Sequence, residues 1–342
     1  MKIEEFDYPL PTALIAQYPP PQRGQSRLLV LRRDSGEVEH RAFQDLPDYL
    51  RSGDLLVTNN TRVLPCRLIG KKETGGRCEL LLVPPRNGTQ GVWGALLKHS
   101  RRVKPGTRVH FGEDMYGIVE EVRSGKGKIR FSAEGKLTDH LQKLGHIPLP
   151  PYIKRKDEPL DRERYQTIFA EVDGSIASPT AGLHFTHALL RAIKAQGVNR
   201  VSITLHVGTG TFSPVRVKDI ENHEMESEWI EISEEAGQEI EQTKRKGGRI
   251  IAVGTTATRA LESVIDSKGG IKSGKHFTSL FIHPPYPFRV IDGLITNFHL
   301  PRSTLVMLVS AFAGKDILMK AYREAVEKRY RFYSYGDAML IL

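Results

Sequence analysis

Residues 291–314 read IDGLITNFHLPRSTLVMLVSAFAG and place a polar cluster directly before an apolar run. Asn297 and His299 belong to the cluster, and residues 305–313 are almost wholly apolar. Ser303 is suited to cap a helix that contains this run. We therefore predict a buried element with polar side chains at its leading edge, which is how many active sites are held rigid. A polar loop that enters a core helix explains the spacing equally well.

Strand and helix patterns alternate from Thr186 onward. Thr186 and Ser233 each precede a helical pattern, and the second pattern has acids in its first turn and bases in its last, as the helix dipole favours. Strand patterns lie between and before these helices, in VNRVSITLHV (198–207), RIIAVGTT (249–256), HFTSLFI (276–282), LLVLRR (28–33) and GDLLVTNN (53–60). This alternation predicts an α/β sandwich.

Residues 66–132 have a different character. They form short apolar-rich runs separated by Gly, Pro, Asn or basic turns, a pattern typical of a small β-barrel or sandwich. A short helix is expected near 135–144, and the proline-rich stretch 145–154 reads as a linker. The predicted fold is therefore α/β: a discontinuous α/β sandwich domain (1–65 and 151–342) with an inserted small β-barrel domain (66–150).

Composition sets limits on the class of protein. The chain has 342 residues, 39% hydrophobic and 26% charged, which is ordinary for a globular protein of two domains or one domain with an insertion. Its acidic start lacks the layout of a signal peptide, and no apolar run approaches the roughly 18 residues that span a bilayer. Cys66 and Cys78 are the only cysteines, too few for a disulfide framework or a four-thiolate zinc site. We expect a cytoplasmic protein without a membrane partner.

Positive charge is concentrated in one part of the chain. The net charge is +10, and residues 98–164 hold sixteen Lys or Arg against ten Asp or Glu, a net charge of +6. Its densest points are at 98–104, 123–130 and 153–156. Such an excess fits a polyanionic partner such as RNA. A solvated barrel surface is the plainer explanation.

Three motifs carry candidate site residues. SPTAGLHF places Thr180, Gly182 and His184 before a helix start, and LHVGTGTF places His206, Gly208 and Gly210 after a strand. Glycine allows close approach of a ligand to the backbone, histidine exchanges protons near neutral pH, and ligands in open α/β sheets favour strand ends. VGTTATRALES places Thr255, Thr256 and Arg259 at a helix N-terminus, where anions such as a carboxylate bind. Packing, tight turns and ordinary capping explain the same patterns.

Further candidates are more scattered. Arg62 follows the predicted strand at 53–60, and the C-terminal YRFYSYGDAMLI contains Tyr335 and Asp337 beside Arg331. Aromatic and arginine side chains can stack on a splayed RNA base, although they can equally complete a sheet. His223 and three glutamates that follow it have no recognised metal-binding spacing, so no metal is predicted.

Motifs throughout the chain resemble one family. LITNFHLP followed by STL and MLVSAF is similar to the signature of the S-adenosylmethionine:tRNA ribosyltransferase-isomerases, the QueA family of queuosine biosynthesis. The resemblance continues, in family order, in PTALIAQYPP and SRLLVL, NNTRVLPCRL (59–68), GHIPLPPYI (145–153), YQTIFA (165–170), SPTAGLHFT (178–186), LHVGTGTFSPV (205–215), VGTTATRALES (253–263) and YRFYSYGDAMLI (330–341). PTAGLHF and TNFHLP are its most specific motifs.

The resemblance implies an activity. The ribosyl part of S-adenosylmethionine would be transferred to, and rearranged on, 7-aminomethyl-7-deazaguanine (preQ1) at the wobble position of tRNA, giving epoxyqueuosine-tRNA, adenine and methionine. S-adenosylmethionine would be a consumed co-substrate, with no other cofactor. His184, His206 and His299 are candidates for proton transfer, with Glu228 as a further acid because it matches a family position. The substrate-binding candidates are Arg62, Thr180, Gly182, Gly208, Gly210, Thr255, Thr256, Arg259, Asn297, Tyr335 and Asp337.

Two other functions compete. An RNA methyltransferase also uses S-adenosylmethionine, but it needs a glycine-rich strand-to-helix turn, which the sequence lacks. A non-catalytic RNA-binding module would need only the barrel and its charge, and it leaves the polar clusters around the three histidines unexplained. We expect an enzyme that acts as a monomer on tRNA.

Overall fold

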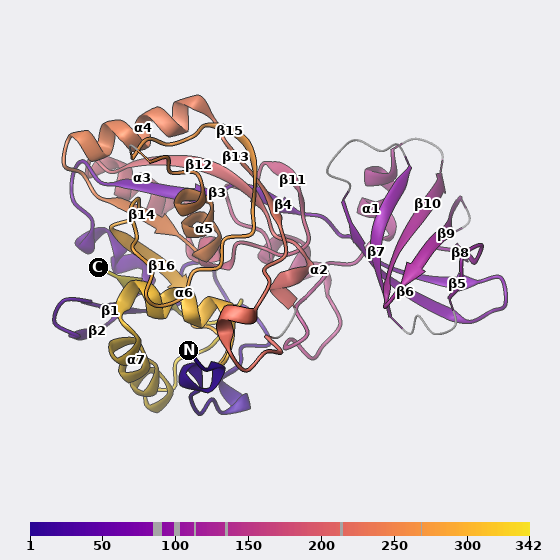
Figure 1. The fold of residues 1–342 in the computed structure, drawn as a ribbon, viewed down its shortest axis with the longest axis horizontal. Coiled ribbons are helices and arrows are strands. Elements are labelled where there is room, and N and C mark those ends of the chain that lie inside the picture. Colours follow the sequence, from indigo (N-terminus) through magenta and orange to yellow (C-terminus); the bar gives the residue numbers. More distant parts are fainter. Residues whose placement is uncertain (85–90, 99–102, 113, 134–135, 213–214, 268) are drawn as a thin grey trace.

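The computed structural model describes residues 1–84, 91–98, 103–112, 114–133, 136–212, 215–267 and 269–342. Figure 1 shows a large α/β body and a small β-barrel that stands to one side of it. The chain enters the barrel from the body and returns to it afterwards. The predicted fold class, an α/β sandwich with an inserted barrel, is confirmed. The boundaries at 65 and 150 stay a prediction.

The body is built on a nine-stranded mixed sheet in the order β15-β13-β12-β3-β14-β16-β17-β1-β2. Four neighbouring strands at its centre, β12, β3, β14 and β16, are parallel, so their carboxyl ends lie at one edge. The strands are β1 (Arg27–Leu31), β2 (Val38–Ala42), β3 (Leu55–Asn59), β12 (Asn199–His206), β13 (Glu228–Ile232), β14 (Ile250–Val253), β15 (Gly274–Thr278), β16 (Gly293–Asn297) and β17 (Ala338–Ile341).

Helices cover both faces of this sheet. One face packs in the larger core with α4 (Glu234–Arg245), α5 (Thr255–Ser263), α6 (Thr304–Ala313) and α7 (Lys315–Glu327). The other face packs against α3 (His187–Ala195) and the 3-10 helices η3 (Phe43–Tyr49) and η5 (Thr180–His184). The central strands β3 and β14 are buried throughout, as expected for parallel strands covered on both sides.

Helix starts follow the side chains that the sequence offers. Thr186 accepts a hydrogen bond from the Leu189 N–H at the start of α3, and Ser233 and Ser303 do the same for α4 and α6. Each hydroxyl satisfies a backbone donor that has no partner within the helix. These three predicted caps are confirmed.

The barrel is closed, with strand order β10-β7-β6-β5-β8-β9. Its own core is separate from the cores of the body. The strands are β5 (Arg67–Lys72), β6 (Arg77–Val83), β7 (Val92–Lys98), β8 (Arg108–His110), β9 (Met115–Arg123) and β10 (Lys126–Ala133), and α1 (Leu137–Leu144) follows them. Of its basic stretch at 98–104, residues 99–102, with Arg101 and Arg102, lie outside the described part of the chain.

One predicted strand is shorter than expected. The pattern at 276–282 predicts a strand throughout, but β15 ends at Thr278. The Thr278 hydroxyl accepts a hydrogen bond from the Leu280 N–H at 3.1 Å, and the Leu280 carbonyl accepts one from Arg259 on α5. These bonds give the backbone partners outside the sheet, so the chain leaves it there.

A buried carboxylate anchors the segment that returns from the barrel. Asp161 on α2 (Pro159–Arg164) accepts two hydrogen bonds from Arg155, at 2.6 and 2.8 Å, and one from the Tyr335 hydroxyl at 2.6 Å. Burial favours a raised pKa for Asp161, but the hydrogen bonds from Arg155 and Tyr335 outweigh it, and the pKa lies below its ordinary value. Nearby, β4 (Thr61–Val63) and β11 (Val172–Ser175) pair in a small parallel sheet.

Asp161→Asn should lower the free energy of unfolding by about 3 kcal/mol, because it removes the buried partner of the Arg155 guanidinium and leaves only Glu158, at 3.9 Å, as a counter-ion. Urea unfolding at neutral pH measures the loss. Glu163→Gln is the control, since Glu163 is an exposed carboxylate on the same helix. Equal stabilities of the two variants would contradict the assigned role of Asp161.

Candidate active site

Polar side chains gather where the parallel strands end. Asn59, His206 and Asn297 are the last residues of β3, β12 and β16. Ligands of open α/β sheets bind outside this edge. The turn after β12 and the beginning of β13 contribute further groups, and we call His206, Gly208, Glu226, Glu228, Trp229 and Arg259 the β12–β13 site.

A buried ion pair lies at the centre of this site. The Glu228 carboxylate accepts a hydrogen bond from Nη1 of Arg259, and the two side chains are only 6% and 8% exposed. The other carboxylate oxygen accepts a hydrogen bond from the backbone N–H of Gly208 at 2.9 Å. The pair therefore fixes the turn after β12 to both β13 and α5.

One donor nitrogen of Arg259 has no partner among the described residues. Its Nε donates to the Leu280 carbonyl at 3.0 Å, while its Nη2 is buried and has no hydrogen-bond partner among the described residues. A buried donor without a partner is unfavourable by roughly 1–3 kcal/mol and calls for an explanation. A bound anion would explain it, because a guanidinium forms strong charge-assisted hydrogen bonds with anions.

A second glutamate links the same turn to the barrel. The Glu226 carboxylate accepts a hydrogen bond from the Thr209 hydroxyl at 2.5 Å and from Lys126 of β10 at 3.0 Å. A side chain at Gly210 would lie 3.2 Å from the Glu226 side chain, so the glycine makes room for this carboxylate. A residue of the barrel thus touches the loop beside the ion pair.

His206 lies in a different environment, half-buried at the end of β12. Its ring stacks on Trp229, with centroids 4.8 Å apart and planes 13° apart, and its Nδ1 is 2.7 Å from the Thr61 hydroxyl. Gly174 lies against the ring, since a Cβ there would come within 2.6 Å of it. These contacts fix the orientation of the imidazole, while His206 stays partly exposed to solvent.

His184 is fully buried and hydrogen-bonded at both nitrogens. Asn297 Nδ2 donates to the Tyr333 carbonyl and lies 3.1 Å from Nε2, so Nε2 is an acceptor. Nδ1 then carries the proton and donates to the Ser26 hydroxyl at 2.7 Å. Burial lowers the pKa of His184 to about 3. The imidazole is neutral at neutral pH.

His299 is buried in a separate place. The ring Nε2 is 2.7 Å from the Thr296 hydroxyl. The backbone N–H of His299 donates a hydrogen bond to the Tyr322 hydroxyl, and its backbone carbonyl accepts one from the Tyr8 hydroxyl. Burial lowers the pKa of His299 to about 3 as well. Its imidazole is thus also neutral.

The other predicted residues fall into groups. Thr255 and Thr256 begin α5 next to Arg259, and the Thr256 hydroxyl accepts from Asn59 at 3.3 Å. Arg62 lies on β4 and donates to the Ala170 carbonyl. Asp337 accepts from the N–H groups of Arg27 and Arg331, and Tyr335 donates to Asp161.

Gly182 and Thr180 belong to η5, just before His184. A Cβ on Gly182 would come within 2.7 Å of the Phe169 ring, so this glycine permits close packing of η5 against that ring. The structure thus brings Gly208, Gly210, Glu228 and Arg259 together, and it places His206 with Trp229 on the opposite face of β13. His184 and Asn297 come together at a separate place.

Sequence reasoning missed Trp229, Thr61 and Gly174. Trp229 has a weak signal, because it is one of two tryptophans and follows Glu228 directly. Gly174 is recognisable only from its contact with His206, 32 positions further along the chain. No group of three or more His, Cys, Asp or Glu side chains in the described ranges is arranged to hold a metal. Likewise, no helix of the described chain is long and apolar enough to cross a membrane.

An open α/β sheet with a glycine turn and a buried ion pair at its carboxyl edge is typical of α/β proteins that bind a ligand at that edge. A family model described as "Queuosine biosynthesis protein" matches residues 3–341. The chain therefore belongs to this family.

Relatives cover the whole chain. It is 52% identical to the S-adenosylmethionine:tRNA ribosyltransferase-isomerase of Halothermothrix orenii and 51% identical to the protein of that name from Staphylococcus saprophyticus, with 100% of both chains covered in each case. The crystal structure of S-adenosylmethionine tRNA ribosyltransferase from Thermotoga maritima is 37% identical, with a TM-score of 0.56 over 99% of this chain and all of that one.

The buried histidines predict a pH dependence of stability. Both folded pKa values are near 3 and the unfolded value is about 6.5, so unfolding takes up protons between these limits. Stability should therefore fall as the pH drops below about 6.5. Each histidine should contribute a loss of up to about 2 kcal/mol between pH 7 and pH 5.

Urea unfolding of the wild type and of His299→Gln at both pH values measures this effect. The variant should be less stable at pH 7 but should lose less on acidification, since one of the two groups is gone. Identical losses in the two proteins would contradict a neutral, buried His299. His276→Gln, at a partly exposed histidine of β15, is the control.

Proposed function

We propose that this protein is an S-adenosylmethionine:tRNA ribosyltransferase-isomerase. It transfers the ribosyl part of S-adenosylmethionine to preQ1 at the wobble position of tRNA and rearranges it, releasing adenine and methionine. S-adenosylmethionine is consumed, and no metal or redox cofactor takes part. The protein acts as a monomer. The observation that carries the proposal is full-length similarity at about 50% identity to enzymes of this name.

His206 is our candidate for proton transfer. The sulfonium of S-adenosylmethionine acidifies the neighbouring ribose methylene, so a general base can start the reaction, and departing adenine gains from a hydrogen bond or a proton. Among the three predicted histidines, His206 alone is part-exposed, at the strand edge where ligands bind. Thr61 and Trp229 hold its ring in one orientation.

His184 and His299 have a different potential role. Both are neutral and enclosed, so neither can supply a proton as an imidazolium near neutral pH. We assign His184, with Asn297, to hydrogen bonding at the ends of the strands. Asn297 Oδ1 is buried without a partner among the described residues, which leaves one acceptor for a ligand donor.

Arg259 is our candidate for recognising the methionyl carboxylate. Its Nη1 is taken by Glu228, and its Nη2 supports this assignment because it is a buried, charged donor that lacks a partner in the described chain. The start of α5, with Thr255 and Thr256, adds the partial positive charge of a helix N-terminus. Gly208 donates its backbone N–H to Glu228, which holds the neighbouring turn, with Gly210, beside the ion pair.

The barrel is our candidate for part of the tRNA interface. Residues 98–164 carry a net charge of +6, and Lys98 and Lys104 are described and exposed members of the basic stretch. Lys126 lies on the barrel and reaches Glu226 beside the β12–β13 site. RNA held by the barrel would therefore lie near that site.

The proposed reaction has a distinctive product. With S-adenosylmethionine and tRNA that carries preQ1, the protein should release adenine and methionine in step with tRNA modification, as measured by liquid chromatography and mass spectrometry. His206→Asn should lower the rate about 100-fold. His276→Asn is the control, at another histidine of the same sheet.

Each outcome separates the competing functions. S-adenosylhomocysteine in place of adenine would identify a methyltransferase, and tRNA binding without any turnover would identify a binding module. Full activity of a folded His206→Asn protein would leave the reaction in place but remove His206 from it.

A pair of ligands tests Arg259. The wild type should bind S-adenosylmethionine at least about 10-fold more tightly than decarboxylated S-adenosylmethionine, because a charge-assisted hydrogen bond contributes about 1.5–3 kcal/mol. Arg259→Lys keeps a cation for Glu228 but loses Nη2, so it should weaken binding of the first ligand and leave the second nearly unchanged. Calorimetry with both ligands gives the four affinities. Equal weakening of both would reduce Arg259 to a structural role.

A further inference from the structure

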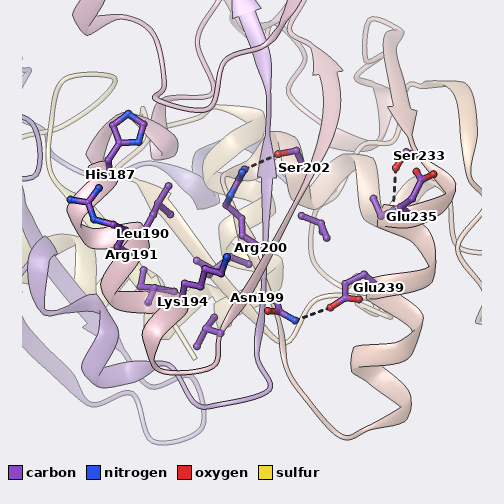
Figure 2. A pocket seen from close by; sticks show the side chains of 15 residues that line it. His187, Leu190, Arg191, Lys194, Asn199, Arg200, Ser202, Ser233, Glu235 and Glu239 are labelled. Atoms are coloured by element: carbon purple, nitrogen blue, oxygen red, sulfur yellow. Dashed lines mark hydrogen bonds between the residues drawn. The ribbon is translucent and has the colours of Figure 1, made fainter.

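A groove opens between α3 and α4, beside the first half of β12 (Figure 2). Its volume is about 670 Å³, within the range of small-molecule and nucleotide sites. It lies outside the β12–β13 site, since the residues that line it come from the other end of β12, from Asn199 to Ser202, and from the two helices.

The groove exists because the sheet is incomplete there. β13 pairs with Thr204, Leu205 and His206 of β12, and it ends at Ile232, where Ser233 begins the turn into α4. β13 therefore does not extend along residues 199–202. The helices on either side of the sheet, α3 and α4, form the walls of the space that remains.

The α3 wall is cationic. His187, Arg191 and Lys194 lie at successive turns of one helix face, and all three are exposed side chains that line the groove. Within the described ranges, neither Arg191 nor Lys194 makes an ion pair or a side-chain hydrogen bond. Their charges are thus not neutralised by the protein.

Arg200 extends this cationic wall from the strand. Its Nη1 donates to the Ser202 hydroxyl at 2.8 Å and to the Thr58 hydroxyl at 3.1 Å. The two hydroxyls orient the guanidinium, and being neutral they do not cancel its charge. Figure 2 shows the hydrogen bond to Ser202. A pre-oriented guanidinium is suited to bind phosphate through paired N–H groups.

The opposite wall carries acceptors. Glu235 and Glu239 lie on α4, and Glu239 accepts a hydrogen bond from Asn199 of β12 at 3.0 Å (Figure 2). Between the walls lie apolar side chains, which include Leu190 and Val201. An occupant should therefore be anionic along α3, apolar in the middle and a hydrogen-bond donor toward α4.

We propose that this groove binds a strand of the tRNA substrate, with its phosphates along α3 and Arg200. Ribose hydroxyls and exocyclic amines of bases supply the donors for the α4 side, and the carboxylates there keep phosphates on the other wall. The inference rests on the proposed function. α3 begins three residues after His184, so its cationic face continues from the edge of the sheet where the strands end.

Charge reversal with a matched control tests the groove. Arg191→Glu combined with Lys194→Glu should raise the Kd for preQ1-bearing tRNA by about 10-fold or more and reduce the slope of log K against log salt by roughly 1 to 2. The control is Lys320→Glu combined with Arg323→Glu, which makes the same change of charge at the same spacing. These two residues are exposed on α7, on the other face of the sheet. The control should change the Kd and the salt slope much less. Fluorescence anisotropy at several salt concentrations measures both, and calorimetry should show unchanged binding of S-adenosylmethionine.

Several results would overturn the assignment. Equal effects of the two double variants would show only general electrostatic attraction. Unchanged tRNA affinity together with altered sedimentation would indicate that the groove binds protein, such as a second copy of the chain. Adenine release by the wild type is measured in parallel. If the wild type turns over tRNA while the groove variant binds it normally, the proposed function stands and the groove inference fails.

Discussion

The ion pair between Glu228 and Arg259 is the interaction on which the candidate site depends. Transfer of two charges from water to a protein interior is unfavourable by several kcal/mol for each, and close pairing only offsets this when the remaining hydrogen-bonding groups are also satisfied. Here the carboxylate is satisfied, by Arg259 and by the Gly208 N–H, whereas the guanidinium is not. The imbalance leaves Nη2 of Arg259 as an unused donor at the edge of the sheet, where an anionic part of a ligand can complete the arrangement.

Much of the fold follows from local signals in the sequence. Thr186, Ser233 and Ser303 predict helix starts because a cap depends on a hydroxyl and an N–H three residues away. The barrel and the α/β alternation are readable from the spacing of apolar runs. The strand predicted at 276–282 ends early because its backbone finds partners elsewhere, one of them Arg259 on the preceding helix α5.

The candidate site is harder to predict from the sequence than the fold, because its contacts join distant parts of the chain. His206 acquires its setting from Thr61, Gly174 and Trp229, and no pattern around His206 points to the first two. Gly182 reads as a place for ligand approach, but the structure places the Phe169 ring against it. Glycine is required in both situations, for a ligand or for a neighbouring ring, and sequence alone does not distinguish them.

The three histidines show how burial divides chemical roles between identical side chains. Enclosure keeps His184 and His299 neutral, which suits fixed hydrogen bonds, whereas His206 keeps access to the strand edge. A reaction between a small donor and a large RNA needs such an accessible edge, because both substrates must reach one point. Lys126 of the barrel, bound to Glu226, lies on one side of that edge, and α3 begins near His184 on the other face of the sheet. An RNA that contacts both the barrel and α3 would therefore have to pass the carboxyl ends of the central strands, where the donor site is proposed.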